Sequence, residues 1–303
     1  MSEKSQYKKS GALLAQSQGW LRRSGLRARK GLGQHFLIDE EVLRLIVDTA
    51  RLTPADVVLE VGPGLGVLTR ELVRRAGWVV AIELDDKLAN LLKKQLAGFN
   101  NITIINDDIL KIDPQALLQE LKVKFTIPAG TPFGYKVVAN LPYYITSPVL
   151  RHFLEASCKP ETMIVMVQKE VAEQIVARPG RMSLLSIGVQ LYGEPTIVAY
   201  VPAQSFYPQP EVDSAILKVV VYPQPAVAIP DKESFFAVVR AGFSAARKQL
   251  ANSLAQGSGL SKEEVLPLLE KANILPQRRA ETLTLEEWAR LWRVFTQSGG
   301  VSC

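Results

Sequence analysis

Short apolar runs alternate with amphipathic segments between residues 41 and 167, and this alternation constrains the fold more than any other feature. The apolar runs, each a candidate buried strand, cover residues 57–61, 78–83, 102–105, 136–139 and 163–167. Helical periodicity covers residues 41–50, 67–75 and 86–96. Strands that alternate with helices form a parallel sheet with helices on both faces. The sequence therefore predicts an α/β fold.

Residues suited to ligand binding stand where these predicted strands end. Gly62 follows the first strand, Glu83 ends the second, Asp108 follows the third and Asn140 follows the fourth. Ligands of such sheets bind at the carboxyl ends of the strands. We therefore expect these four residues to lie in one site.

The tetrapeptide Asn140-Leu141-Pro142-Tyr143 suits chemistry at the amino group of a planar base. The Asn140 amide oxygen and the Leu141 carbonyl can both accept hydrogen bonds from one exocyclic amine. Pro142 fixes the backbone of the turn, and the Tyr143 ring offers a face on which a base can stack. Two acceptors that converge on one nitrogen align its lone pair with an electrophile.

Five segments resemble the rRNA adenine dimethyltransferases, which use S-adenosylmethionine. They are 33–37, the glycine-rich turn 60–66, 140–146, 206–214 and 279–284. The resemblance covers roughly residues 25–293. It is greatest to the bacterial small-subunit (16S) rRNA adenine N6,N6-dimethyltransferases, the kasugamycin-sensitivity enzymes.

This resemblance implies a Rossmann-like methyltransferase sheet followed by a small all-helical C-terminal domain. It also implies methylation at N6 of two adjacent adenosines in a hairpin loop near the 3′ end of 16S rRNA, in an assembling small ribosomal subunit. We expect a monomer, because the sequence leaves no unusual apolar stripe over. The alternatives are a large-subunit (23S) antibiotic-resistance methyltransferase and a non-catalytic assembly or transcription factor on the same fold. Residues 279–283 and 212–215 favour the small-subunit enzymes, and the intact Asn140–Tyr143 motif disfavours a non-catalytic role.

The resemblance also assigns cofactor-binding residues. Gly62 and Gly64 would let the backbone approach the cofactor, and Glu83 would accept the ribose hydroxyls. Asp108, rather than Asp107, would accept from the adenine amino group. The segment that contains His35 and Leu37 would close over the cofactor, and Asn140 would also contact it. An ordinary strand–helix turn and solvated strand-end acids remain the alternatives. Glu60 could meet the positive end of the cofactor.

By the same resemblance, Phe206 covers the target base opposite Tyr143, so that Asn140, Leu141, Pro142, Tyr143 and Phe206 form the catalytic set. The alternative for Phe206 is a simple core position. Two residues depart from the family pattern, since His35 and Tyr144 stand where Asn is more frequent.

Charge and composition suggest three regions: a basic arm over residues 1–30, a methyltransferase domain over 31–222 and a helical RNA-binding domain over 223–303. Residues 1–30 contain eight basic residues and one acid, a net charge of +7, whereas the other 273 residues have a net charge of −1. The arm could follow a phosphate backbone, form a solubilising leader or act as a transit peptide. Arg247-Lys248 and Arg278-Arg279 could bind phosphates or lie on a solvated helix face.

Several classes of protein are disfavoured by composition. No apolar run is long enough to span a membrane, and the first 30 residues lack a signal-peptide core. Only two cysteines occur, Cys158 and Cys303, which argues for a reducing cytoplasm and against a disulfide framework or a structural zinc site. We therefore expect a cytoplasmic protein that needs no metal.

Overall fold

The computed structural model describes residues 11–25, 29, 33–124, 134–245 and 247–298, which form two compact units. The first unit comprises residues 1–172 and 196–221, and the second comprises 173–195 and 222–303. The second unit thus takes in residues 173–195, which the sequence analysis placed in the methyltransferase domain. The chain leaves the first unit and returns to it before the linker near residue 223.

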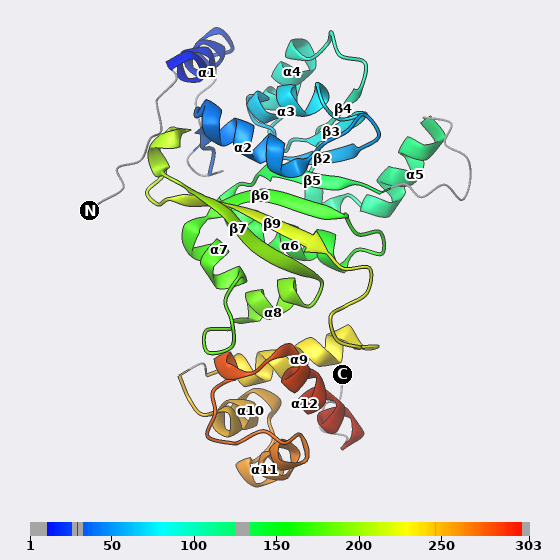
Figure 1. Ribbon diagram of the computed structural model, residues 1–303, viewed down its shortest axis with the longest axis vertical. Helices are drawn as coiled ribbons and strands as arrows, with labels where there is room; N and C mark the ends of the chain where they lie inside the picture. Colours follow the sequence, from blue (N-terminus) through cyan, green and yellow to red (C-terminus); the bar gives the residue numbers. More distant parts are fainter. Residues whose placement is uncertain (1–10, 26–28, 30–32, 125–133, 246, 299–303) are drawn as a thin grey trace. The chain divides into compact units, whose positions relative to one another are not determined.

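A seven-stranded sheet forms the centre of the first unit, in the order β4-β3-β2-β5-β6-β9-β7 (Figure 1). The strands are β2 (Val57–Val61), β3 (Trp78–Ile82), β4 (Ile102–Ile105), β5 (Lys136–Asn140), β6 (Thr162–Gln168), β7 (Gly193–Val201) and β9 (Ser214–Val221). The strands from β4 to β6 are parallel to their neighbours, and β9 runs antiparallel to β6. The predicted α/β sheet is confirmed.

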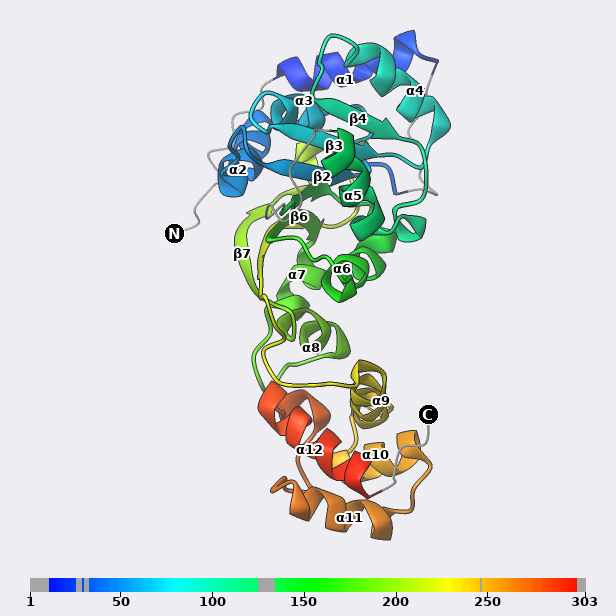
Figure 2. The ribbon, with the colours of Figure 1, turned by 90° about the vertical axis from the view of Figure 1, so that its right-hand side faces the viewer.

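Helices cover the sheet as the alternation predicts. The helix α2 (Glu40–Ala50) lies against β5 and β6, α3 (Val67–Val73) against β3, and α4 (Asp86–Gln95) against β4. Figure 2 shows α2 on one side of the strands and α6 (Thr146–Glu155) on the other. A further helix, α5, covers Pro114–Lys124. The central strands are almost fully buried because helices exclude water from both faces.

A two-stranded antiparallel sheet joins segments that are distant in sequence. Strand β1 (Phe36–Leu37) pairs with β8 (Phe206–Tyr207), with Leu37 opposite Phe206. Beside this pair the Ile38 N–H donates to the Ser205 carbonyl, at the end of η4 (Ala203–Ser205), over 2.9 Å. The two strands therefore bring the 33–37 and 206–214 motifs together.

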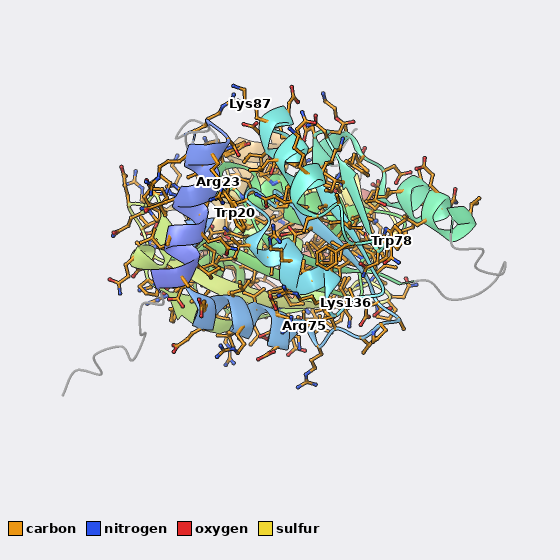
Figure 3. All side chains as sticks on the ribbon, turned by 90° about the horizontal axis from the view of Figure 1, so that it is seen from above. Trp20, Arg23, Arg75, Trp78, Lys87 and Lys136 are labelled. Atoms are coloured by element: carbon orange, nitrogen blue, oxygen red, sulfur yellow. The ribbon has the colours of Figure 1, made fainter. Side chains whose placement is uncertain are left out.

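Part of the predicted basic arm is a helix, α1 (Gly11–Arg23), packed on the first unit. Trp20 and Leu21 are buried, and the Arg70 guanidinium of α3 lies 4.9 Å from the centre of the Trp20 ring. Figure 3 labels Trp20 and the neighbouring Arg23 on this helix. Residues 1–10, 26–28 and 30 of the predicted arm lie outside the described residues.

The second unit is helical. It contains α8 (Leu184–Gln190), α9 (Lys232–Phe243), α10 (Leu250–Ser258), α11 (Lys262–Lys271), η5 (Ala280–Thr282) and α12 (Leu285–Gln297), while α7 (Lys169–Ile175) crosses the boundary between the units. Trp288, Phe295 and Phe235 form the fully buried centre. Capping boxes at Ser261 and Thr284 start α11 and α12. No helix among the described residues has the length and apolar character needed to cross a membrane.

Candidate active site

One pocket in the first unit opens at the carboxyl ends of β2, β3 and β5 and extends to the residues that follow β4. Its walls include ten of the eleven residues that the sequence analysis placed in the catalytic and cofactor-binding sets: His35, Leu37, Gly62, Gly64, Glu83, Asp108, Asn140, Leu141, Pro142 and Tyr143. Phe206 is the exception. Because parallel strands end at one edge of the sheet, residues from four separate motifs meet there.

The glycine turn forms the floor of this pocket. Gly62 and Gly64 have φ angles of 65° and 58°, in the left-handed region that favours glycine. A Cβ on Gly62 would lie 3.2 Å from Pro142 Cδ, and a Cβ on Gly64 would lie 3.1 Å from the Phe36 ring. The turn is therefore packed directly under the Asn140–Tyr143 loop, and its bare backbone faces the pocket.

Glu83 is a buried carboxylate that is oriented by backbone donors. The Gly64 N–H donates to its Oε2 over 3.0 Å, and the Asp85 N–H donates to its Oε1 over 2.9 Å. Its exposed fraction is 6%, and burial raises its pKa above the ordinary value. Each oxygen retains a lone pair for an external hydroxyl, so Glu83 can hold a diol such as a ribose.

Glu60 is a second buried carboxyl group in the pocket wall, and its exposed fraction is 1%. Its Oε2 has no hydrogen-bond partner among the described residues. Burial raises the pKa of Glu60 to about 8, and the nearby Glu83 charge adds to this effect. A buried carboxyl oxygen without a hydrogen bond is costly, and a cationic ligand would lower that cost.

Asp108 caps the short helix η2 (Ile109–Lys111), because its Oδ1 accepts from the Leu110 N–H over 3.0 Å. Its other oxygen is left for an external donor such as an adenine amino group. Asp107 also lines the pocket but is exposed, and its carboxylate accepts from the Asp108 N–H. Each of the two carboxylates thus accepts one backbone N–H, and Asp108 is the less exposed of the two.

The amide of Asn140 is held in one orientation by a contact across the pocket. Its Nδ2 donates to the His35 carbonyl over 3.1 Å. A carbonyl can only accept, so this bond leaves the Asn140 Oδ1 as the group that faces an incoming amine. The Leu141 N–H donates to the Met166 carbonyl over 3.2 Å, which anchors the turn to β6.

Tyr143 is the first residue of the short helix η3 (Tyr143–Ile145). Both the face and the hydroxyl of its ring are held by contacts. Its hydroxyl shares a 2.6 Å hydrogen bond with Ser214 Oγ, and its ring stacks with His35 at a centroid distance of 5.7 Å. The His35 Nδ1 donates to the Pro208 carbonyl over 2.8 Å. Burial raises the pKa of Tyr143, so the phenol stays neutral. His35 therefore supports Asn140 and Tyr143 in addition to lining the pocket.

Phe206 lies elsewhere. Its side chain is 2% exposed, belongs to the hydrophobic core and does not line the pocket. The pairing of β8 with β1 explains this position, since Phe206 stands opposite the buried Leu37. In this structure Phe206 therefore occupies a core position, which was the alternative to its base-covering role.

Gly33, Gln34 and Phe36 of the 33–37 segment also line the pocket, although the sequence analysis gave them no individual role, and so does Asp85. Asp85 caps α4, because its carboxylate accepts from the Lys87 and Leu88 N–H groups. It also forms an ion pair with Arg29, with Nη1 and Oδ2 3.3 Å apart. Gln34 accepts from the Arg29 N–H through its side chain. Arg29 and Gln34 are only five residues apart, and this short separation was the sequence signal for their contact.

Among the predicted phosphate-binding residues of the second unit, Arg278 is engaged internally. Its guanidinium donates to both oxygens of Glu287 and to the Thr282 carbonyl and hydroxyl. Arg279 is more exposed, with a longer ion pair of 3.8 Å to Glu281. Lys248 is exposed and lies 3.3 Å from the Gln256 side-chain oxygen. Arg279 and Lys248 are thus better placed than Arg278 to contact a phosphate.

The pocket therefore combines acceptors for a nucleoside, a buried acid and an oriented amide beside an aromatic ring. No cluster of three or more potential metal-binding side chains occurs among the described residues. This arrangement suits the binding of an adenosine-containing cofactor next to a base whose amino group is held by Asn140.

Known proteins are similar to this chain in sequence and in fold. The model of the family described as ribosomal RNA adenine dimethylase matches residues 25–297. The ribosomal RNA small subunit methyltransferase A of Dehalococcoides mccartyi is 54% identical over 288 residues, which is 95% of each chain. Its namesake in Moorella thermoacetica is 44% identical over 281 residues, which is 91% of this chain and 95% of the relative.

Two solved structures are similar over most of the chain. The 23S rRNA methyltransferase ErmE is 31% identical with a TM-score of 0.64, covering 86% of this chain and all of its own. A dimethyladenosine transferase from Plasmodium falciparum is 25% identical with a TM-score of 0.71, covering 88% of this chain and 98% of its own. The predicted Rossmann-like methyltransferase fold is confirmed, and the chain belongs to the ribosomal RNA adenine dimethylase family.

Proposed function

We propose that this protein transfers methyl groups from S-adenosylmethionine to N6 of two adjacent adenosines in a hairpin loop near the 3′ end of 16S rRNA. Each adenosine becomes N6,N6-dimethyladenosine. The observation that carries the proposal is the Asn140 amide, which the His35 carbonyl holds with its oxygen left for an amine. Relatives such as the one in Dehalococcoides mccartyi are named small subunit methyltransferases, and this name supports 16S rather than 23S rRNA as the substrate.

The pocket residues fit the cofactor. Glu83 would accept the ribose hydroxyls, and Asp108 would accept from the adenine amino group. The bare backbone of Gly62 and Gly64 admits close approach, and the unpartnered oxygen of Glu60 suits the cationic methionine end. When bound, S-adenosylmethionine supplies a methyl group made electrophilic by its sulfonium.

The Asn140–Tyr143 turn would activate the adenosine. The exocyclic amine of adenosine is a poor nucleophile because its lone pair is delocalised into the ring. The Asn140 Oδ1 and the Leu141 carbonyl accept hydrogen bonds from its two N–H groups, localise the lone pair and stabilise positive charge on nitrogen. The nitrogen takes the methyl group as the bond between that group and the sulfonium sulfur breaks, and it then loses one proton to water. The Tyr143 ring, held by Ser214 and His35, positions the base. Pro142 packs on Gly62 and keeps these groups beside the cofactor.

The partner would be the assembling small ribosomal subunit, and the enzyme would act as a monomer in the cytoplasm. In an unpaired loop, moving the target base out of its stack costs only on the order of a few kcal/mol or less. Residues 1–30 and the helical region 223–303 would contact RNA around the loop, largely through phosphates and shape.

The test is methyl transfer to small subunits isolated from a strain that lacks the modification, with products identified by nucleoside mass spectrometry. The wild-type protein should give N6,N6-dimethyladenosine at both positions. The Asn140→Ala variant should lose roughly 10²- to 10³-fold in kcat while it still binds subunits. Asn90→Ala, which alters an exposed asparagine on α4, is the matched control and should behave as wild type.

Two results would contradict the proposal. Methylation of large-subunit RNA alone would assign the protein to the 23S enzymes, an outcome that the similarity to ErmE makes worth testing. Wild-type protein that binds subunits but methylates neither RNA would indicate a non-catalytic assembly factor.

A further inference from the structure

A cation–aromatic pair of a half-buried lysine and an exposed tyrosine lies at the same edge of the sheet as the candidate active site. Tyr200 is the penultimate residue of β7, and its exposed fraction is 49%. Lys169 directly follows β6, and its Nζ lies 5.2 Å from the centre of the Tyr200 ring. Neither residue lines the cofactor pocket. The pair is therefore separate from the cofactor site.

Short contacts connect this pair to the ring that would hold the target base. The Lys169 N–H donates to the Asp213 carbonyl over 3.0 Å, and the next residue, Ser214, bonds to the Tyr143 hydroxyl over 2.6 Å. The Asp213 carboxylate accepts from the Ala203 N–H, two residues after β7 ends. One segment of backbone thus anchors both the Tyr143 ring and the Lys169–Tyr200 pair.

Within the described part of the chain, Lys169 has no carboxylate partner. None of the ion pairs among the described residues involves Lys169, and the nearby Asp213 carboxylate is directed to the Ala203 N–H. The ring of Tyr200 is half exposed on the edge strand of the sheet. An available ammonium group beside an accessible aromatic face matches the two parts of a nucleotide, its phosphate and its base.

We infer that Tyr200 and Lys169 form a second RNA subsite, which binds an unpaired nucleotide flanking the target adenosine. Tyr200 stacks on the base, and Lys169 contacts its phosphate. This inference rests on the proposed function, since it assumes that an rRNA loop enters at Tyr143. The subsite would hold the loop open while the target base lies on Tyr143, because an aromatic ring replaces the stacking that the flanking base loses.

The experiment uses the full-length protein and a synthetic hairpin from the 3′ end of small-subunit rRNA. The fluorescent base 2-aminopurine, whose emission falls on stacking, replaces a nucleotide on one side or the other of the two adenosines. Tyr200→Ala should abolish the quenching seen at one of these positions and weaken hairpin binding about 5- to 150-fold. Tyr200→Phe and Tyr200→Trp should retain both properties.

Salt dependence separates the role of the lysine from that of the ring. Lys169→Gln should reduce the slope of log K against log salt by about 0.7, the contribution of one single-strand phosphate. Tyr200→Ala should leave the slope unchanged. Val220→Ala, which trims an exposed side chain near the far end of β9, is the control and should match wild type. Calorimetric binding of S-adenosylmethionine should be equal in all variants.

If the Tyr200→Ala protein quenches 2-aminopurine and binds the hairpin as the wild type does, the subsite is overturned while the proposed function stays intact. Loss of subunit binding with normal hairpin binding would also overturn it, because the pair would then contact a ribosomal protein. Wild-type protein that binds neither the hairpin nor small subunits would overturn both proposals.

Discussion

Glu60 and Glu83 place two buried carboxyl groups at the ends of adjacent strands in the wall of the pocket. Burial raises the pKa of both groups, that of Glu60 to about 8. The unfolded chain has the ordinary value near 4.5. The folded protein therefore binds a proton at Glu60 more tightly than the unfolded chain does, and the stabilising effect of that proton is lost as pH rises towards 8.

We expect Glu60→Gln to remove most of this pH dependence in the cofactor-free protein. The neutral amide cannot ionise, so the difference in unfolding free energy between about pH 5 and about pH 8 should shrink by on the order of a few kcal/mol. The measurement is urea unfolding across this range. Glu161→Gln, which changes an exposed carboxyl group directly before β6, serves as the control. Parallel pH curves for wild type and Glu60→Gln would show that Glu60 ionises normally.

The site residues that stand at strand ends could be predicted from the sequence. The contacts that join segments distant in sequence could not. Gly62, Glu83, Asp108 and Asn140 follow from the strand pattern, because a parallel sheet must gather them. The bond from Asn140 to His35 depends instead on how residues 33–37 lie over the sheet, which no local pattern encodes.

Phe206 illustrates the same limit. Its motif predicts proximity to the active site, and the pairing of β8 with β1 provides that proximity. The direction of the ring is set by the alternation of side chains along a strand of two residues, where a shift of one position exchanges core and surface. Sequence alone does not fix that register.

Among the elements, the three helices and five strands predicted within residues 41–167 match α2, α3, α4 and β2 to β6 closely because each has a clear periodicity, whereas α5 and α6 were not predicted. The helix α1 was not, since its basic residues suggested an arm. Its buried face is narrow and includes Ser17, Trp20 and Leu21. It packs against Arg70 of α3, a partner that no local pattern identifies. Tertiary contact rather than propensity stabilises such a helix.

The loop before α12 depends on one guanidinium. Arg278 bonds both Glu287, in the first turn of α12, and Thr282, in η5, so a charged side chain satisfies acceptors on two elements. Arg278→Ala should lower the stability of the second unit by about 1–3 kcal/mol, the value for lost hydrogen bonds to charged groups. Arg278→Lys should recover little, because an ammonium cannot reproduce the planar fork. Thermal unfolding followed by circular dichroism measures the effect.

The adjacent Arg279 is the matched control for this prediction. Its ion pair with Glu281 is long and exposed, so Arg279→Ala should change stability by less than about 0.5 kcal/mol. If Arg278→Ala were equally harmless, the fork of hydrogen bonds would not support the helix. An Arg279→Ala variant that binds small subunits more weakly at unchanged stability would agree with phosphate contact at that position.

For the whole molecule, the distribution of charge matters more than the net charge of +6, because the excess lies in residues 1–30. Phosphate contacts by such a region would add affinity that falls with salt, and sequence-independent attraction would guide the protein to the subunit. The described part of the chain contributes Arg22 and Arg23 in the last turn of α1. The region would thus act as an electrostatic guide, separate from the chemistry at Asn140.

Replacing Lys4, Lys8 and Lys9 with Gln lowers the charge of residues 1–30 from +7 to +4 without shortening the chain. If these lysines contact phosphates, the salt slope of small-subunit binding should fall by roughly 2–3, at about 0.7–0.9 for each contact. The measurement is the dissociation constant over a range of salt concentrations. At saturating subunits kcat should be unchanged, since no atom of the reaction is touched.

The control for this variant removes the same charge from another surface. It has Gln in place of three exposed lysines of α4, namely Lys87, Lys93 and Lys94. A smaller loss of slope in the control would locate the contacts in the arm. Equal losses would mean that net charge alone sets affinity. An unchanged slope in the arm variant would instead identify residues 1–10 as a solubilising leader, and the phosphate contacts would then have to come from groups such as Lys169, Lys248 and Arg279.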